Sequence, residues 1–304
     1  MTPVPTDTAS VTLPAVAPGL LGRIVYRLFP VRRRVLLENL RIVYGEDAPP
    51  GRLRALAEAF YGHLARSLLE YAMLPWLSAR KKASLVRIEN GEAVAQAAER
   101  RKGILILTGH FGNWEVAPLF GLARLPLYRG RFHFVRRPIR ARWIERLVTR
   151  RFHAAGIHVI PKKGSLEMIL ERLSSGDIVV FILDQHAAPK DGVEVDFFGR
   201  KASTLRSLAV IALATGAPVV PAACFREPGG GHVLRFEDPL PPVDAEDPDE
   251  AIRARTLQYN RALEQLILQH PEQWFWIHRR WKEESLRARR SRRRKRVAAQ
   301  EKLP

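Results

Sequence analysis

The pattern of apolar positions changes once along the chain, at Gly103. Before it, apolar residues recur at spacings of three and four, which predicts amphipathic helices. The clearest stripe lies between Arg52 and Trp76 and consists of Leu53, Leu56, Ala57, Phe60, Leu64, Leu68 and Leu69. We therefore expect residues 20–95 to be helical.

After Gly103 the apolar residues come in short runs with helical patterns between them. The runs are ILIL at 104, FHFV at 132, IHVI at 157, IVVFIL at 178, PVVPA at 218 and HVLRF at 232. Helical patterns cover residues 139–155, 165–173 and 205–214. This alternation is typical of an α/β fold with a mixed, largely parallel sheet flanked by helices.

The C-terminal part begins with the Pro- and Asp-rich segment DPLPPVDAEDPDE. Asp247 is a candidate N-cap and Pro248 a first helical residue, which predicts a helix to about Gln269. We expect one domain over residues 20–285, comprising a helical part (20–95), an α/β core (96–243) and a C-terminal helical part (244–285). Residues 1–19 read as a flexible leader and the basic residues 286–304 as a disordered tail.

Composition narrows the function without deciding it. The 304 residues are 46% hydrophobic, which is enough for a full core. The formal net charge of +19 favours anionic partners such as nucleic acid, an anionic membrane or phosphate-bearing substrates. The segment GLLGRIVYRLFP at 19–30 is shorter than the roughly 20 apolar residues that span a bilayer, so it predicts an interfacial helix or a core helix.

The strongest candidate chemistry lies in ILILTGHFGNWE at 104–115. His110 follows a buried strand, where α/β folds gather their sites, and Gly109 and Gly112 permit a tight turn or a close substrate approach. Glu115 can return toward the imidazole, and a carboxylate on one ring nitrogen raises the basicity of the other. Three other histidines also have an acid five positions later, so context rather than spacing selects His110.

Several ordered motifs then point to a family. They are GHFGNWE at 109–115, RRP at 136–138, DQ at 184–185, FFGR at 197–200, TGAPVVP at 215–221 and HPEQWFWIHRRWK at 270–282. Over residues 20–285 the chain resembles the bacterial lipid A biosynthesis acyltransferases, lauroyl and myristoyl transferases of the lysophospholipid acyltransferase superfamily. The mycobacterial phosphatidylinositol mannoside acyltransferases share this pattern.

The resemblance implies a glycerolipid acyltransferase-like fold and an O-acyltransferase. The acyl chain would move from a thioester of acyl carrier protein or coenzyme A to a hydroxyl of a glycolipid such as a lipid A precursor, with no metal and no cofactor beyond that donor. His110 matches the family's general base and Glu115 its acidic partner, and no acyl-enzyme would form. The acceptor stays open, because a phosphatidylinositol mannoside-like lipid or a lysophospholipid would also fit.

Further substrate-binding candidates follow from the same motifs. Arg137 matches a basic family residue that would hold substrate phosphate, although Arg136 could serve instead. Asp184 would pair with an arginine or cap the next turn. The remaining candidates are Asn113, Gln185, Phe198 and Arg200. The last two could line an acyl groove and meet phosphate, or form an ordinary turn packed on the core.

The chain departs from the family in one respect: its relatives usually begin with a membrane-spanning helix. We expect peripheral attachment to the anionic cytoplasmic face of the inner membrane, through interfacial helices, the basic surface and the tail. The aromatic and basic segment WFWIHRRWK is expected to combine head-group contact with ordinary packing.

Two other function classes are weaker. A nucleic-acid-binding protein would use the tail RRSRRRKR, but no helix-turn-helix, zinc-finger or RNA-recognition signature is present, so no specific nucleic acid is expected. A hydrolase would need Ser165, Ser203 or Ser207 as nucleophile, and no Gly-x-Ser-x-Gly elbow exists. Cys224, the single cysteine, reads as a buried strand residue rather than a nucleophile.

Overall fold

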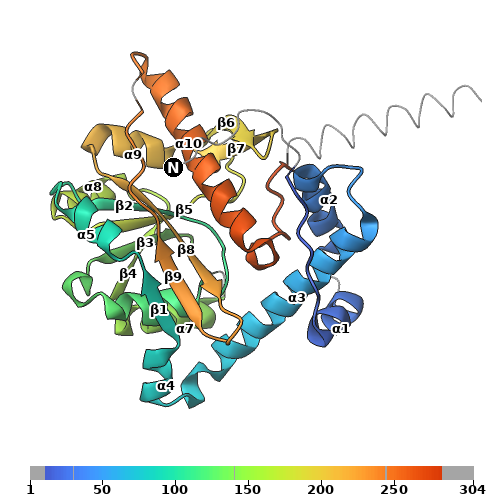
Figure 1. The fold of residues 1–304 in the computed structure, drawn as a ribbon. Helices are drawn as coiled ribbons and strands as arrows, with labels where there is room; N and C mark the ends of the chain where they lie inside the picture. The colour runs from blue at the N-terminus through green and yellow to red at the C-terminus, as the bar shows by residue number, and fades with distance from the viewer. Residues whose placement is uncertain (1–10, 30, 140, 244, 283–304) are drawn as a thin grey trace, which may run out of the picture.

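The computed structural model describes residues 11–29, 31–139, 141–243 and 245–282 (Figure 1). The predicted basic tail and the first ten residues of the predicted leader lie outside these ranges. The rest of that leader is packed rather than free, because Leu13 is buried in the hydrophobic core.

The first two helices stand together at one side of the sheet, and the long third helix leads from them to a short α-helix, which lies beside the first strand (Figure 1). They are α1 (Leu20–Leu28), α2 (Arg33–Tyr44), α3 (Pro50–Met73), the short η1 (Leu74–Trp76) and α4 (Ala79–Ser84). Helix α1 crosses α3 where Gly22 meets Gly62, and a Cβ on Gly22 would overlap the carbonyl oxygen of Glu58. Two glycines thus let the helices approach closely, and the α1 face opposite the contact stays open to solvent.

A seven-stranded sheet forms the core, which confirms the predicted fold class. Its strands are β1 (Val86–Glu89), β2 (Ile104–Thr108), β3 (Phe132–Arg136), β4 (Ile157–Pro161), β5 (Ile178–Ile182), β8 (Val219–Arg226) and β9 (His232–Phe236). The order is β1-β9-β8-β2-β5-β3-β4, and among these neighbours only β8 and β9 run antiparallel. Strand β1 lies where a helix was predicted, and its formation depends on pairing with the distant β9 rather than on local pattern.

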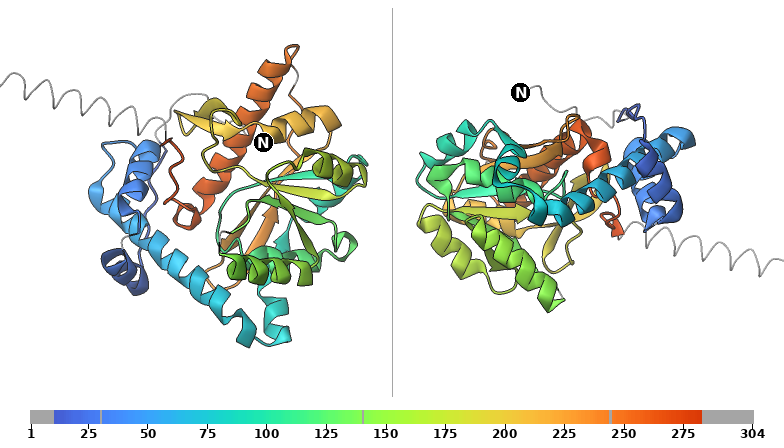
Figure 2. Two further views of the ribbon diagram at one scale, coloured as in Figure 1. Left: turned by 180° about the vertical axis from the view of Figure 1, so that it is seen from behind. Right: turned by 90° about the horizontal axis from the view of Figure 1, so that it is seen from below.

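Helices cover both faces of this sheet (Figure 2). The connecting helices are α5 (Glu92–Ala98), α6 (Val116–Gly121), η2 (Leu122–Arg124), η3 (Pro126–Tyr128), α7 (Arg142–Ala154), α8 (Leu166–Ser174) and α9 (Ser207–Thr215). Alternate residues of β2 enter different clusters: Leu105 and Leu107 pack with α8, α9 and the N-terminal helices, and Ile106 packs with α5, α6 and α7. The strand is buried on both faces, which explains its unbroken apolar run.

A hairpin and a long helix complete the domain. Strands β6 (Gly192–Phe197) and β7 (Arg200–Leu205) pair antiparallel and pack on α10 (Pro248–Gln269), which is followed by η4 (Pro271–Gln273). The Asp247 carboxylate accepts a hydrogen bond from the Glu250 amide at 2.8 Å, which confirms the predicted helix start.

The tryptophans of the segment after η4 are buried, which confirms the packing part of the expectation, and contact of the exposed Arg279 and Lys282 with head groups stays a prediction. Trp274, Trp276 and Trp281 are at most 2% exposed. The guanidinium of Arg280, fully buried, donates from its two terminal nitrogens to the Ser203 carbonyl and to the Thr204 hydroxyl, so these two nitrogens are paired inside the protein. Among the described helices, none has both the length and the apolar character needed to cross a bilayer.

Candidate active site

The carboxyl ends of three neighbouring strands bring the candidate residues together. His110 follows β2, Asp184 and Gln185 follow β5, and Arg136 ends β3. Because β2, β5 and β3 are adjacent and parallel, their ends meet at one edge of the sheet, where sites of open α/β folds form.

The carboxylate that holds His110 belongs to Asp184. The Nδ1 atom of His110 lies 2.9 Å from one carboxylate oxygen, and the His110 amide donates to the other at 2.7 Å. The indole of Trp274 donates to that second oxygen at 2.9 Å. We had expected this role of Glu115, and had expected Asp184 to pair with an arginine or cap a turn. Both expectations are corrected, because the parallel pairing of β2 with β5 sets Asp184 directly beside His110.

The electrostatics of this pair suit a general base. Burial alone would raise the pKa of Asp184, but the charge of His110 and the hydrogen bonds from His110 and Trp274 lower it to about 2. Burial would also lower the pKa of His110, and the neighbouring Asp184 carboxylate outweighs it, so the net shift is upward. An ionised Asp184 favours the tautomer with the proton on Nδ1, which leaves Nε2 as the basic nitrogen.

Aromatic rings hold the imidazole of His110, which lines an apolar cavity and stays partly exposed. The imidazole lies between Trp114 and Phe275, with ring centroids 5.3 Å and 5.8 Å away. Its side chain is 17% exposed, against 3% for Asp184. The exposed Gln185 side chain lies 3.3 Å from Nε2.

The two glycines near His110 allow close approach within the protein, and Gly109 also lines the cavity beside His110. A Cβ on Gly109 would lie 2.9 Å from the Asp184 carboxylate. Gly112 has a φ of 53°, and a Cβ there would overlap the carbonyl oxygen of Cys224. Both positions therefore require glycine, since any side chain would push the loop off the neighbouring strands.

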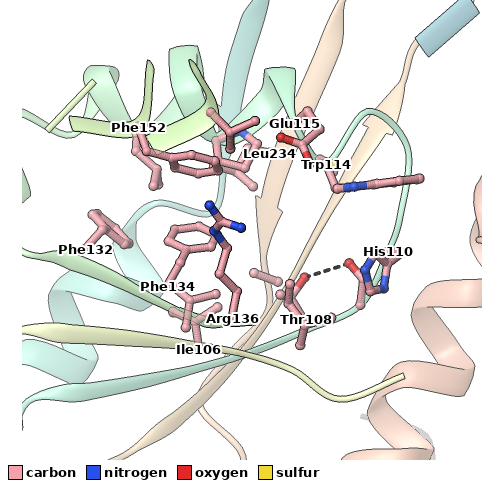
Figure 3. Close-up of a pocket in the computed structure, with 18 of the residues that line it drawn as sticks. Ile106, Thr108, His110, Trp114, Glu115, Phe132, Phe134, Arg136, Phe152 and Leu234 are labelled. Carbon is pink, nitrogen blue, oxygen red and sulfur yellow. Dashed lines mark hydrogen bonds between the residues drawn. The ribbon is translucent and has the colours of Figure 1, made fainter. Parts of the chain in front are cut away.

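An apolar cavity of about 220 Å³ opens beside His110. Figure 3 shows His110 at one end of its lining and Phe132 at the other, with Phe134 and Phe152 along the wall. The wall combines residues of β2, β3, β8 and β9 with α7, so the cavity runs from the edge of the sheet that carries His110 to that helix. Such a lining fits a hydrocarbon chain.

Two charged residues interrupt this apolar wall. Arg136 lies within the cavity and donates to Glu145 at 2.8 Å (Figure 3). Burial raises the pKa of Glu115, against the opposing charges of Arg136 and His110. One Glu115 oxygen is buried without a hydrogen-bond partner among the described residues. Glu115 therefore faces the site as a charge neighbour of His110 rather than as its hydrogen-bonded partner.

The other predicted substrate-binding residues lie elsewhere. Arg137 is exposed and does not line the cavity, and its neighbour Arg136 does. Asn113 is buried and bonded to Glu70 and to the Ser67 carbonyl, so its amide is committed within the protein.

The β6–β7 hairpin does not contribute to the cavity. Phe198 is buried at the hairpin turn, where its amide donates to Glu264, and Arg200 is exposed on β7. Phe198 fits the alternative of a turn packed on the core, because its amide is bonded to Glu264 of α10. Binding of substrate by Phe198 and Arg200 stays a prediction.

The rival nucleophiles are poorly placed. Cys224 lines the cavity, but burial raises the pKa of its thiol to about 12, and the thiol donates to the Phe111 carbonyl. Ser165, Ser203 and Ser207 are not part of the cavity lining. Within the described ranges, no group of three or more His, Cys, Asp or Glu residues is arranged to hold a metal ion.

Sequence reasoning missed the function of Trp274. The motif WFWIHRRWK drew attention to the segment, but its aromatic and basic composition suggested a membrane boundary. In the structure the Phe275 amide also donates to the His110 carbonyl at 3.1 Å, so this distant segment supports the His110 loop directly.

Comparison with known proteins shows the family of the chain. Residues 16–283 match the family model of the bacterial lipid A biosynthesis acyltransferases. The chain is 26% identical over 265 residues to the lipid A biosynthesis lauroyltransferase of Escherichia coli, covering 86% of this chain and 83% of the relative. It is 28% identical over 255 residues to the phosphatidylinositol mannoside acyltransferase of Mycobacterium tuberculosis, covering 81% and 76%.

A third relative is the lipid A biosynthesis palmitoleoyltransferase of Escherichia coli, 23% identical over 253 residues, with 83% of this chain and 79% of that one covered. The family match spans most of the chain and includes the strands and loops that carry His110 and Asp184. The chain therefore belongs to the bacterial lipid A biosynthesis acyltransferase family, and it is an acyltransferase.

Proposed function

We propose that this protein transfers a fatty acyl chain from a thioester of acyl carrier protein or coenzyme A to a hydroxyl of a glycolipid, with His110 as general base. The observation that carries the proposal is the partly exposed imidazole of His110 at the end of an apolar cavity, with Nδ1 held by a buried carboxylate. The donor is a substrate, and the proposal needs no other cofactor.

The reaction would proceed by direct attack. The acceptor hydroxyl takes the place of the Gln185 amide at Nε2 and gives its proton to that nitrogen as its oxygen attacks the thioester carbonyl. The carbon–oxygen bond forms, the carbon–sulfur bond breaks, and the departing thiolate takes the proton from the imidazolium. Asp184 holds the ring and stabilises its positive charge throughout.

Arg136 and Glu115 supply the remaining charges. The Arg136 guanidinium lies in the cavity wall, where a positive charge stabilises the oxyanion that develops on the thioester carbonyl. Glu115 offsets part of the combined positive charge of Arg136 and the protonated His110. The acyl chain extends from His110 toward Phe132 (Figure 3).

The acceptor lipid would reach the site from a membrane surface. Leu20 is 73% exposed and Leu28 66% exposed on the outer face of α1, and Trp76, beyond the end of α3, is 80% exposed. Arg23 and Arg27 lie on α1 among these apolar residues, and the chain carries a net charge of +19. Apolar side chains flanked by cations suit the anionic cytoplasmic face of the inner membrane.

The test is transfer of a labelled acyl chain to purified glycolipids. Acyl carrier protein and coenzyme A thioesters are compared as donors, with a lipid A precursor, a phosphatidylinositol mannoside and a lysophospholipid as acceptors. We expect a glycolipid product and a loss of at least about a hundredfold in His110→Ala. Equal rates in wild type and His110→Ala would overturn the mechanism, and transfer only to the lysophospholipid would overturn the acceptor class.

A further inference from the structure

A polar cluster joins helix α3 to the loop that carries His110. Its centre is Glu70, which pairs with Arg226 on β8 through one carboxylate oxygen. The other oxygen lies 3.1 Å from His232 Nε2 on β9 and accepts a hydrogen bond of 2.9 Å from the Asn113 amide. Arg226 also donates to the Ser67 hydroxyl at 3.1 Å, one helical turn before Glu70.

Asn113 connects this cluster to the loop that carries His110. Its amide nitrogen donates to Glu70 and, at 3.3 Å, to the Ser67 carbonyl. Its side-chain oxygen accepts from the Val116 amide at 3.2 Å, at the start of α6. Only Phe111 and Gly112 separate Asn113 from His110, and Gly112 has the left-handed conformation of the tight turn. Fixing Asn113 therefore fixes one end of the turn that aims the imidazole.

The charge of Glu70 does more than fill space between α3 and the His110 loop. Burial would raise the pKa of Glu70, but hydrogen bonds from His232, Arg226 and Asn113 lower it to about 2, so it is a carboxylate at neutral pH. Partly buried ion pairs add little net stability, because the cost of removing charges from water offsets their attraction. A charged acceptor does, however, specify the direction and distance of the Asn113 amide, which apolar contact would not.

We propose that Glu70 is a positioning residue for acyl transfer: acting through Asn113, it holds the loop so that His110 Nε2 faces the cavity. Glu70 touches neither the cavity nor His110, so its effect is on the geometry of the base. This inference rests on the proposed acyltransferase mechanism. Misplacement of a reacting group by about 1 Å can cost about a hundredfold in rate, so loss of this bond is expected to reduce kcat.

The test compares Glu70→Gln, Asn113→Ala and the double variant by kcat, KM and thermal stability of the folded protein. We expect kcat to fall about tenfold or more in each single variant, with KM for the thioester nearly unchanged. Because both residues act along one path, the double variant should be no worse than the poorer single variant. Asn113→Ala keeps the Glu70 ion pairs, so it decides the question if Glu70→Gln fails to fold.

The chain offers a matched control in Asp177→Asn. Asp177 also pairs with one arginine and one histidine, Arg131 at 3.1 Å and His133 at 2.9 Å, but no hydrogen bond links it to the His110 loop. This variant should lose stability and keep the wild-type kcat. If Glu70→Gln behaves in the same way, or if its effect multiplies with that of Asn113→Ala, the positioning role is overturned. Absence of acyl transfer in the wild type would instead overturn the proposed function, and this role with it.

Discussion

The two ends of strand β5 each carry a histidine–aspartate pair, and His110 lines the apolar cavity of the candidate site, whereas His133 does not. At the start of the strand, Asp177 lies 2.9 Å from His133 Nε2. Beyond the other end, Asp184 lies 2.9 Å from His110 Nδ1. The distances are equal, so a histidine–carboxylate contact alone does not define a catalytic site.

The environments of the two imidazoles differ. His133 stacks on His158 with ring centroids 5.2 Å apart, and its aspartate is shared with Arg131. Burial lowers the pKa of His133 despite Asp177, whereas the pKa of His110 is raised because Asp184 outweighs burial. The pair at the carboxyl end therefore combines a more basic ring with access to the apolar cavity, and the pair at the other end has neither.

Replacing the two histidines should give the largest contrast. His110→Ala is expected to lower kcat by about two to four orders of magnitude, because the base is removed. His133→Ala should retain acyl transfer, since His133 does not line the cavity. Both variants are compared in one steady-state assay after their folding has been checked by circular dichroism. A large loss of kcat in folded His133→Ala would break the comparison.

Replacing the two aspartates should give the next largest contrast. Asp184→Asn keeps the shape of the side chain but removes the charge that stabilises the imidazolium, so kcat should fall about a hundredfold. Asp177→Asn should affect melting temperature rather than kcat. The comparison fails if the two variants lose the same fraction of kcat.

The pH dependence of the reaction should distinguish how the carboxylate acts. Under the proposed mechanism only neutral His110 accepts the proton, so kcat/KM should rise with pH through a pKa above the ordinary histidine value of 6.5. In Asp184→Asn the charge and the charged hydrogen bond of Asp184 no longer raise this pKa, while burial still lowers it and only Glu115 opposes burial. The low-pH side of the profile should therefore move to lower pH. If the low-pH side of the kcat/KM profile does not shift in Asp184→Asn, then Asp184 does not set the basicity of His110.

The smallest expected effect concerns chain length. Phe152 lines the cavity on α7, away from His110 in Figure 3. Phe152→Leu should enlarge this part of the cavity and shift the preferred donor toward longer acyl chains, with little change in the rate at the best length. The measurement is kcat/KM over a series of thioesters. An unchanged preference would mean that the chain does not extend toward Phe152.

Sequence patterns predicted the strands of the core well, because strands buried on both faces appear as continuous apolar runs. They missed β1 and the β6–β7 hairpin, whose residues alternate or are polar and acquire strand structure by pairing. The sequence identified His110 from its place after a strand. It did not identify Asp184 as the partner of His110, because that contact depends on β2 lying beside β5. Glu115 was predicted instead because it is near His110 in sequence.

The sequence also did not predict that the tryptophans of the C-terminal aromatic segment are all buried. Tryptophans beside arginines resemble a membrane boundary in composition, and only the tertiary structure shows that Arg280 is paired with Ser203 and Thr204 inside the protein. Conversely, the apolar stripe of α3 continues past its buried half, and Leu68 and Leu69 are exposed. Periodicity identified the helix but not where its contact with the core ends.

The most direct test of the account is a double-mutant cycle on kcat with His110→Ala, Asp184→Asn and both together. If Asp184 acts only by orienting the His110 ring and stabilising its positive charge, the double variant will have the same kcat as His110→Ala alone. If the two losses multiply, Asp184 acts independently of His110, and the central claim of a histidine base held by this aspartate is contradicted.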